Sequence, residues 1–143
     1  MLQRIQSVFL FLAALACFGL FATDAADTDR AMADSNLFAD GSFNIFDDPV
    51  LMGAFTLAGV LLLVVVFLYK NRPLQMKLSL AAVVVVLFGL GYGVFLWLND
   101  LAGKVASPDV GIVLPVLAII LALLGRRYVK QDEQLVRSAD RLR

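Results

Sequence analysis

The side chains that carry most protein chemistry are scarce in this sequence of 143 residues. Histidine is absent, which removes the commonest general base and the commonest metal ligand. Cys17 is the single cysteine, so neither a disulfide within the chain nor a cysteine-based metal cluster can form. No HExxH, GxSxG or phosphate-binding pattern occurs either. We therefore expect no enzyme activity, no metal site and no cofactor.

Residues 89–93, Gly-Leu-Gly-Tyr-Gly, contain the Gly-Tyr-Gly sequence of potassium selectivity filters. A filter needs a re-entrant loop after a pore helix, with a threonine that contributes to the ion sites. Here the glycines lie within an unbroken apolar run. Gly89 and Gly93 are four residues apart, the spacing that lets two helices approach closely. We interpret them as part of a helix-packing face.

Basic residues beside the apolar segments form the candidate binding site. If their helices pack as neighbours, these side chains converge at one membrane level, where each positive charge near an anionic leaflet contributes about 1 kcal/mol. We expect them to contact lipid headgroups or a protein partner; in the alternative, they only fix orientation and hold the helix ends at the headgroups. The candidate residues are Arg72, Lys77, Arg126, Arg127 and Lys130.

Four apolar blocks position these residues, at about residues 5–22, 50–69, 78–98 and 110–126. Each is close to the roughly 20 residues that a helix needs to cross about 30 Å of hydrocarbon. Hydrophobic residues make up 61% of the chain, above the level of a soluble domain. The sequence predicts an all-α membrane protein, with a four-helix transmembrane domain over residues 1–127 and a helical tail over residues 128–143.

The first block has an alternative interpretation as a cleaved signal peptide. Arg4 supplies a basic start, and the small residues from Ala22 to Ala26 resemble a cleavage site. The apolar run nevertheless continues past Cys17 through residues 18–21, and its length suits a membrane span. We expect a retained helix.

Lysine and arginine are distributed unequally between the connections. Ten of the twelve precede the first block, follow the fourth, or separate the second from the third, and only Arg30 and Lys104 lie in the other two connections. Under the positive-inside rule, this bias places both termini in the cytoplasm. Polar residues inside the blocks are few and, apart from Arg126 at the end of the fourth block, none is charged, which argues against an ion-coupled transporter. They are Gln6, Ser7, Thr56 and Ser79.

The first outer loop, residues 23–49, is long and rich in aspartate. Within residues 36–46, Asp40-Gly41 is flanked by apolar, partly alternating residues, which is typical of a short hairpin. An irregular loop with aromatic residues at the membrane interface is an equal alternative.

Small residues predict how the helices pack and where the last one begins. Ser107 suits an N-cap and Pro108 the first helical position, while Pro115 predicts a kink because it lacks a backbone donor. In the tail, Glu133 lies four residues before Arg137, a pair that supports a helix. The predicted packing faces contain Gly111, Pro115, Ala118 and Ala122 in the fourth block and Gly53 and Thr56 in the second.

Three segments together resemble a known family. They are MLQRIQS at residues 1–7, FLYKNRPLQ at 67–75 and KQDEQLVRSADRLR at 130–143. The chain is similar over its whole length to the bacterial membrane proteins called domain of unknown function 4293, widespread in the Bacteroidota. The resemblance implies four helices in a bacterial inner membrane and brings neither an activity nor site residues.

The sequence therefore favours a non-enzymatic accessory or assembly subunit. Its partners would be the lipid bilayer and a protein at the cytoplasmic face, with no nucleic acid. The alternative is an oligomeric channel or transporter for a neutral or apolar small solute.

Overall fold

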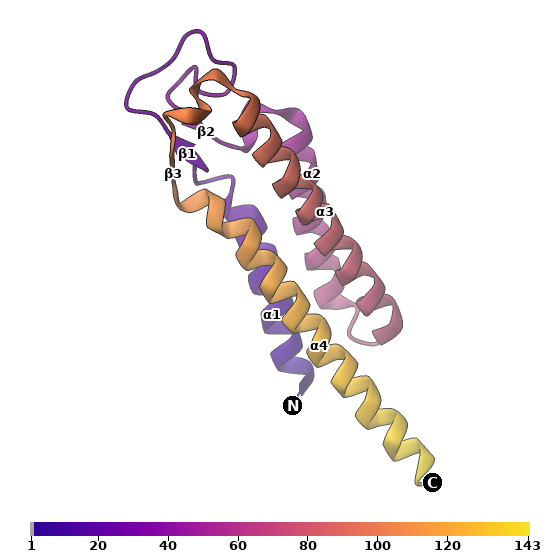
Figure 1. The fold of residues 1–143 in the computed structure, drawn as a ribbon. Coiled ribbons are helices and arrows are strands. Elements are labelled where there is room, and N and C mark those ends of the chain that lie inside the picture. Colours follow the sequence, from indigo (N-terminus) through magenta and orange to yellow (C-terminus); the bar gives the residue numbers. More distant parts are fainter. Residues whose placement is uncertain (1) are drawn as a thin grey trace.

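The computed structural model describes residues 2–143, most of which lie in four helices (Figure 1). Each helix packs against two others, α1 against α2 and α4, and α3 against α2 and α4. Figure 1 shows both termini at the same end of the molecule as the α2–α3 connection. The helices are α1 (Leu2–Gly19), α2 (Pro49–Phe67), α3 (Arg72–Asn99) and α4 (Val113–Arg141).

Side-chain caps fix the starts of two helices. The backbone N–H of Val50 donates to Asp48 Oδ1 (2.7 Å), with Pro49 in the first position of α2. The backbone N–H of Leu74 donates to Asn71 Oδ1 (3.2 Å) at the start of α3. Helix α3 therefore begins at Arg72, six residues before the predicted apolar block, and includes residues 72–77, which were predicted to lie in a connection.

Within residues 2–143, three segments are long and apolar enough to cross a membrane, namely α2, α3 and Val110–Arg141. The apolar part of α1, Arg4–Gly19, is shorter. Its 16 residues span about 24 Å at 1.5 Å per residue, against about 30 Å of hydrocarbon. Like the longer helices, α1 exposes large apolar side chains, among them Val8, Phe11 and Leu15.

A small antiparallel sheet covers the end of the bundle opposite the termini (Figure 1). We call this sheet, with the loops and 3-10 helices of residues 20–48 and 100–112, the cap. Its order is β2-β1-β3, and Ala26 of β1 pairs with Phe43 of β2 and with Pro108 of β3. Short 3-10 helices η1 (Ile45–Asp47), η2 (Leu101–Lys104) and η3 (Val110–Ile112) flank these strands. The strands are β1 (Ala26–Asp27), β2 (Ser42–Phe43) and β3 (Ser107–Pro108).

Of the two alternatives for residues 36–46, the hairpin is wrong in its pairing. The turn itself exists, since the N–H of Gly41 donates to the carbonyl of Phe38 (3.0 Å) and Gly41 has φ 90°. However, β2 pairs with β1 rather than with the residues before the turn. Phe38 and Phe43, on the two sides of the turn, are both buried in the core. The residues before the turn form no strand.

The predicted start of the fourth helix is also wrong. Ser107 and Pro108 form β3, and α4 begins only at Val113. The backbone N–H groups of Asp109 and Gly111 donate to the carbonyls of Ala25 and Asp24 (2.8 and 2.9 Å), so the chain here is held by the cap. Pro115 consequently lies in the first turn of α4, where its missing N–H has no intrahelical partner to lose. The reason for expecting a kink disappears.

The predicted packing faces are confirmed in α3 and α4 but not in α2. Gly111, Pro115, Ala118 and Ala122 are all buried. A Cβ at Gly89 would lie 3.0 Å from the ring of Phe55, so this glycine permits the close approach of α2. Gly53 is exposed, with nothing within 4 Å of its Cβ position, because α2 turns a different face inward. That face comprises Leu51, Ala54, Phe55, Ala58, Gly59, Leu62 and Val65.

Candidate functional site at the basic end of the bundle

The two ends of the bundle carry opposite charge. The end with the termini and the α2–α3 connection, which we call the basic end, has ten lysines and arginines and three acids. The end covered by the sheet, which we call the capped end, has two lysines and arginines and nine acids. The antiparallel arrangement of the helices therefore gathers almost all the positive charge at one end.

An ion pair joins two helices at the basic end. Arg72 Nε donates to Asp132 Oδ2 at 2.9 Å, and the two side chains are only 23% and 15% exposed. Arg72 is the first residue of α3, whereas Asp132 lies in the predicted tail. The pair fastens the start of α3 to α4 beyond the apolar segment.

Contacts with α1 hold the same part of α4. The rings of Phe9 and Tyr128 stack with centroids 5.3 Å apart. A Cβ at Gly125 would lie 2.8 Å from Leu10 Cγ, and Val129 is completely buried. Residues 128–133, which we call the tail root, are thus packed onto the bundle rather than free in solvent.

Residues 134–143, which we call the free tail, are all exposed, and α4 continues through Arg141 without a break. Figure 1 shows this end of α4 extending past the other helices. Arg137 Nη2 donates to Glu133 Oε1 at 2.7 Å, the predicted pair one turn apart. The helical continuation predicted from the sequence is present, but the tail has two parts with different surroundings.

The structure brings together only part of the predicted basic cluster. Arg72 reaches α4 through Asp132, and Arg127 and Lys130 are exposed on α4. Arg126 is half-buried, and its Nε has no hydrogen-bond partner among the described residues. Lys77 is exposed on another side of α3, because five residues turn a helix by about 140° relative to Arg72.

Two buried amide side chains near the basic end were missed or underrated. Gln6 is fully buried, and both polar atoms of its side chain lack a partner among the described residues. Gln75 is equally buried; its Nε2 donates to the carbonyl of Val65 (3.0 Å), while Oε1 has no described partner. The spacing of Gln6, Leu10, Ala13 and Cys17 could have predicted that Gln6 faces the core. Gln75 was overlooked because α3 begins earlier than its apolar block.

At the capped end, Asp100 joins the first outer loop to the end of α3. Its carboxylate accepts hydrogen bonds from Ser35 Oγ (2.6 Å) and from the backbone N–H groups of Ala102 (2.9 Å) and Leu37 (3.4 Å). Burial raises the pKa of Asp100, but these hydrogen bonds outweigh it and hold the pKa below its ordinary value. The carboxylate is therefore a charged tie between two loops.

Asp27, also at the capped end, has the opposite tendency. Desolvation, together with repulsion from Asp109 and Asp24, raises the pKa of Asp27.

No group of three or more His, Cys, Asp or Glu residues within the described part of the chain has the arrangement to hold a metal ion.

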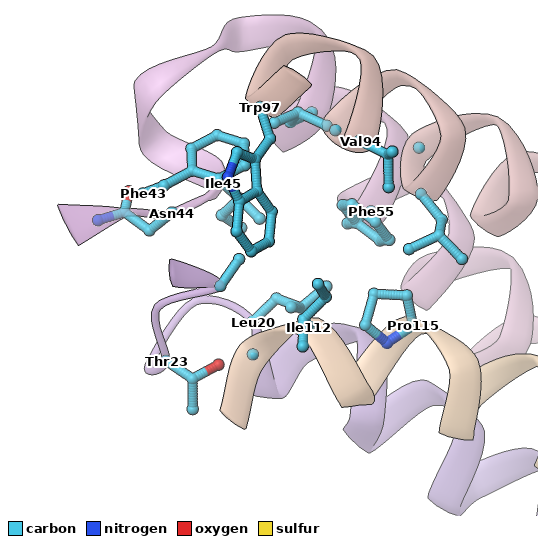
Figure 2. Close-up of a pocket in the computed structure, with 16 residues that line it drawn as sticks. Leu20, Thr23, Phe43, Asn44, Ile45, Phe55, Val94, Trp97, Ile112 and Pro115 are labelled. Atoms are coloured by element: carbon cyan, nitrogen blue, oxygen red, sulfur yellow. The ribbon is translucent and has the colours of Figure 1, made fainter. Parts of the chain in front are cut away.

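A cavity of about 50 Å³ lies beneath the sheet at the capped end (Figure 2). It is bordered by Trp97 and Val94 of α3, Ile112 and Pro115 on the α4 side, and Phe55 of α2. Its lining is almost entirely apolar. This cavity is far along the bundle from the basic residues singled out in the sequence.

Comparison with known proteins identifies one family. Residues 2–142 match a family described as Domain of unknown function (DUF4293). No curated protein and no solved structure matches the chain.

Proposed function

The chain belongs to the DUF4293 family, and we propose that it is a non-enzymatic accessory or assembly subunit of a bacterial inner membrane. In this proposal it crosses the bilayer four times, with both termini in the cytoplasm. The charge asymmetry of the two ends supports this orientation, because positively charged flanks remain on the cytoplasmic side. Although α1 is short, it supports a fourth span because it packs against α2 and α4 and exposes apolar side chains as they do.

The free tail is the observation that carries the proposed role. It is a helix with Leu135 (59% exposed) and Leu142 (90% exposed) on one face and Arg137 and Arg141 on the other. Its root is fixed by the Arg72–Asp132 ion pair and the contact with α1, so the tail extends in a defined direction. A preorganised amphipathic helix loses little conformational freedom on binding, which favours docking of a cytoplasmic protein partner.

Truncation after Glu133 tests this role. It removes the free tail while retaining the tail root, whereas a cut after Arg127 would also remove Tyr128 and Asp132. We expect the shortened chain to insert and accumulate normally and to lose a partner that chemical cross-linking captures on the full chain in native membranes.

Point variants make the same test sharper. Leu135→Gln combined with Leu142→Gln should reproduce the loss, because it removes the apolar face without shortening the helix. Asp140→Gln, at an exposed position on the opposite face of the helix, is the matched control and should retain the cross-link. If the truncated chain and the double variant keep every partner of the full chain, the tail has no docking role.

The alternative function is an oligomeric channel or transporter for a neutral or apolar small solute. The apolar cavity at the capped end favours it over ion transport. Solute uptake by sealed vesicles that contain only this protein would support it, since an accessory subunit has no transport activity of its own.

A further inference from the structure

The cavity at the capped end, which we call the cap cavity, is lined by α2, α3, α4 and the segment that follows α1. Leu20 directly follows α1, Phe55 lies in α2, Gly93 and Trp97 lie in α3, and Pro115 lies in α4. Figure 2 shows the indole of Trp97 directed into the space that separates α3 from Ile112 and Pro115. Because glycine at position 93 has no side chain, the α3 wall leaves this space open.

The polar side chains of the lining offer nothing to a polar ligand. The Thr23 hydroxyl donates to the carbonyl of Gly19 (3.0 Å), and the Trp97 indole N–H donates to the carbonyl of Gly103 (2.8 Å). The Asn44 amide donates to Asp24 Oδ1 (3.2 Å) and accepts from the N–H of Phe46 (3.0 Å). Each group already has a partner within the protein, so the cavity favours a hydrocarbon occupant.

The position and size of the cap cavity indicate which hydrocarbon this is. Val94, on its border, is 39% exposed, so the cavity reaches the outer surface of the bundle beside α3. From Trp97 to Gly89 the lining extends about 12 Å along α3, at 1.5 Å per residue. A volume of about 50 Å³ is well below the roughly 150 Å³ of an apolar cavity that holds benzene. It suits a segment of chain rather than a whole molecule.

We infer that the cap cavity binds a segment of an acyl chain from a bilayer lipid, inserted beside α3 in the leaflet at the capped end. This rests on the proposed membrane insertion and adds a lipid-binding site to it. The chain segment contacts Trp97, Val94 and Ile112, and the sheet above closes the cavity toward water. Lipid bound there would hold α3 and α4 at a fixed separation beneath the cap.

Trp97 is the only tryptophan in the chain and therefore reports on this site directly. We would reconstitute the full chain into phosphatidylcholine bilayers with and without bromine in the upper part of one acyl chain, since bromine quenches tryptophan fluorescence on contact. Gly93→Val should lose most of the quenching because it fills the cavity, with its Cβ in ordinary contact with Leu51 (3.5 Å). Ile112→Ala should increase the quenching because it enlarges the cavity.

Gly91→Val is the matched control, because a Cβ at this position meets nothing within 4 Å. It should be quenched as strongly as the unsubstituted chain. Equal quenching in Gly93→Val and Gly91→Val, or no quenching of the unsubstituted chain, would overturn the site. Failure of membrane insertion is distinguishable, since it would also abolish protection of the helices from water-soluble labels in the same vesicles.

Discussion

At the scale of single residues, the best-defined interactions lie in the cap rather than among the basic residues. The carboxylate of Asp100 accepts hydrogen bonds from Ser35, Leu37 and Ala102. The indole N–H of Trp97 donates to the carbonyl of Gly103 in η2. Sequence patterns could not predict this tie, because Ser35 and Asp100 are 65 positions apart and nothing local connects them. By contrast, the side-chain cap of α2 by Asp48 follows a local rule that can be read directly.

The Asp100 tie predicts an acid sensitivity of the cap. Because the folded-state pKa of Asp100 lies below its unfolded value, its stabilising contribution is complete above that unfolded pKa, near 4, and is lost as pH falls through the folded pKa. Asp100→Asn should lower stability at neutral pH by about 1–3 kcal/mol. Thermal unfolding in detergent, followed by Trp97 fluorescence, would measure both effects.

The comparison with Asp100→Asn isolates this carboxylate from Asp27, whose raised pKa has the opposite consequence. The ionised carboxylate of Asp27 destabilises the folded state, and this destabilisation is lost as pH falls through the folded-state pKa of Asp27. The difference in stability between the unsubstituted chain and Asp100→Asn should shrink toward acid pH. A difference that stays constant across this range would show that the charge of Asp100 does not hold the cap.

At the scale of elements, periodicity in the sequence predicted the helices better than their ends. Apolar blocks gave four helices, and small residues correctly identified the inward face of α4. The start of α4 was misplaced because Ser107 and Pro108 pair with β1, a tertiary contact that overrides a good local capping signal. The α2 face was misassigned because Gly53 and Thr56 alone do not define a face, whereas the buried residues Ala54, Ala58 and Leu62 follow each other at four-residue spacing.

Glycine positions in α3 make this distinction testable. Gly89→Leu should destabilise the bundle strongly, by about 1–3 kcal/mol, because its Cβ already lies 3.0 Å from the Phe55 ring and the added atoms overpack the interface. Gly93→Leu should be milder, since its Cβ would lie 3.5 Å from Leu51 beside the cap cavity. Melting of each purified variant in detergent gives the order. Gly91→Leu is the control, and equal effects at all three positions would contradict a close-packed face at Gly89.

At the scale of the whole molecule, charge segregation and helix arrangement support the same topology. The positively charged segments that are far apart in sequence lie at one end of the bundle, and the acidic loops lie at the other (Figure 1). The sequence predicted this segregation from the order of the blocks alone. It could not predict that Asp132 pairs with Arg72 and divides the tail into a packed root and an exposed helix, because that depends on how α3 and α4 pack.

The central proposal is that all four helices cross the bilayer with both ends in the cytoplasm, and labelling of single cysteines tests it most directly. The background is Cys17→Ala, which removes the one buried native cysteine. Single cysteines are then introduced at three positions, one per variant. One is added in a short extension ahead of residue 1, and the others replace Asp34 in the exposed outer loop and Ser138 in the free tail. Intact cells are treated with a membrane-impermeant maleimide. We expect labelling at Asp34→Cys alone, and labelling of the other two only after permeabilisation. In intact cells, labelling ahead of residue 1 without labelling at Ser138→Cys would show that α1 does not cross, and labelling at both of these positions in place of Asp34→Cys would show the reverse orientation.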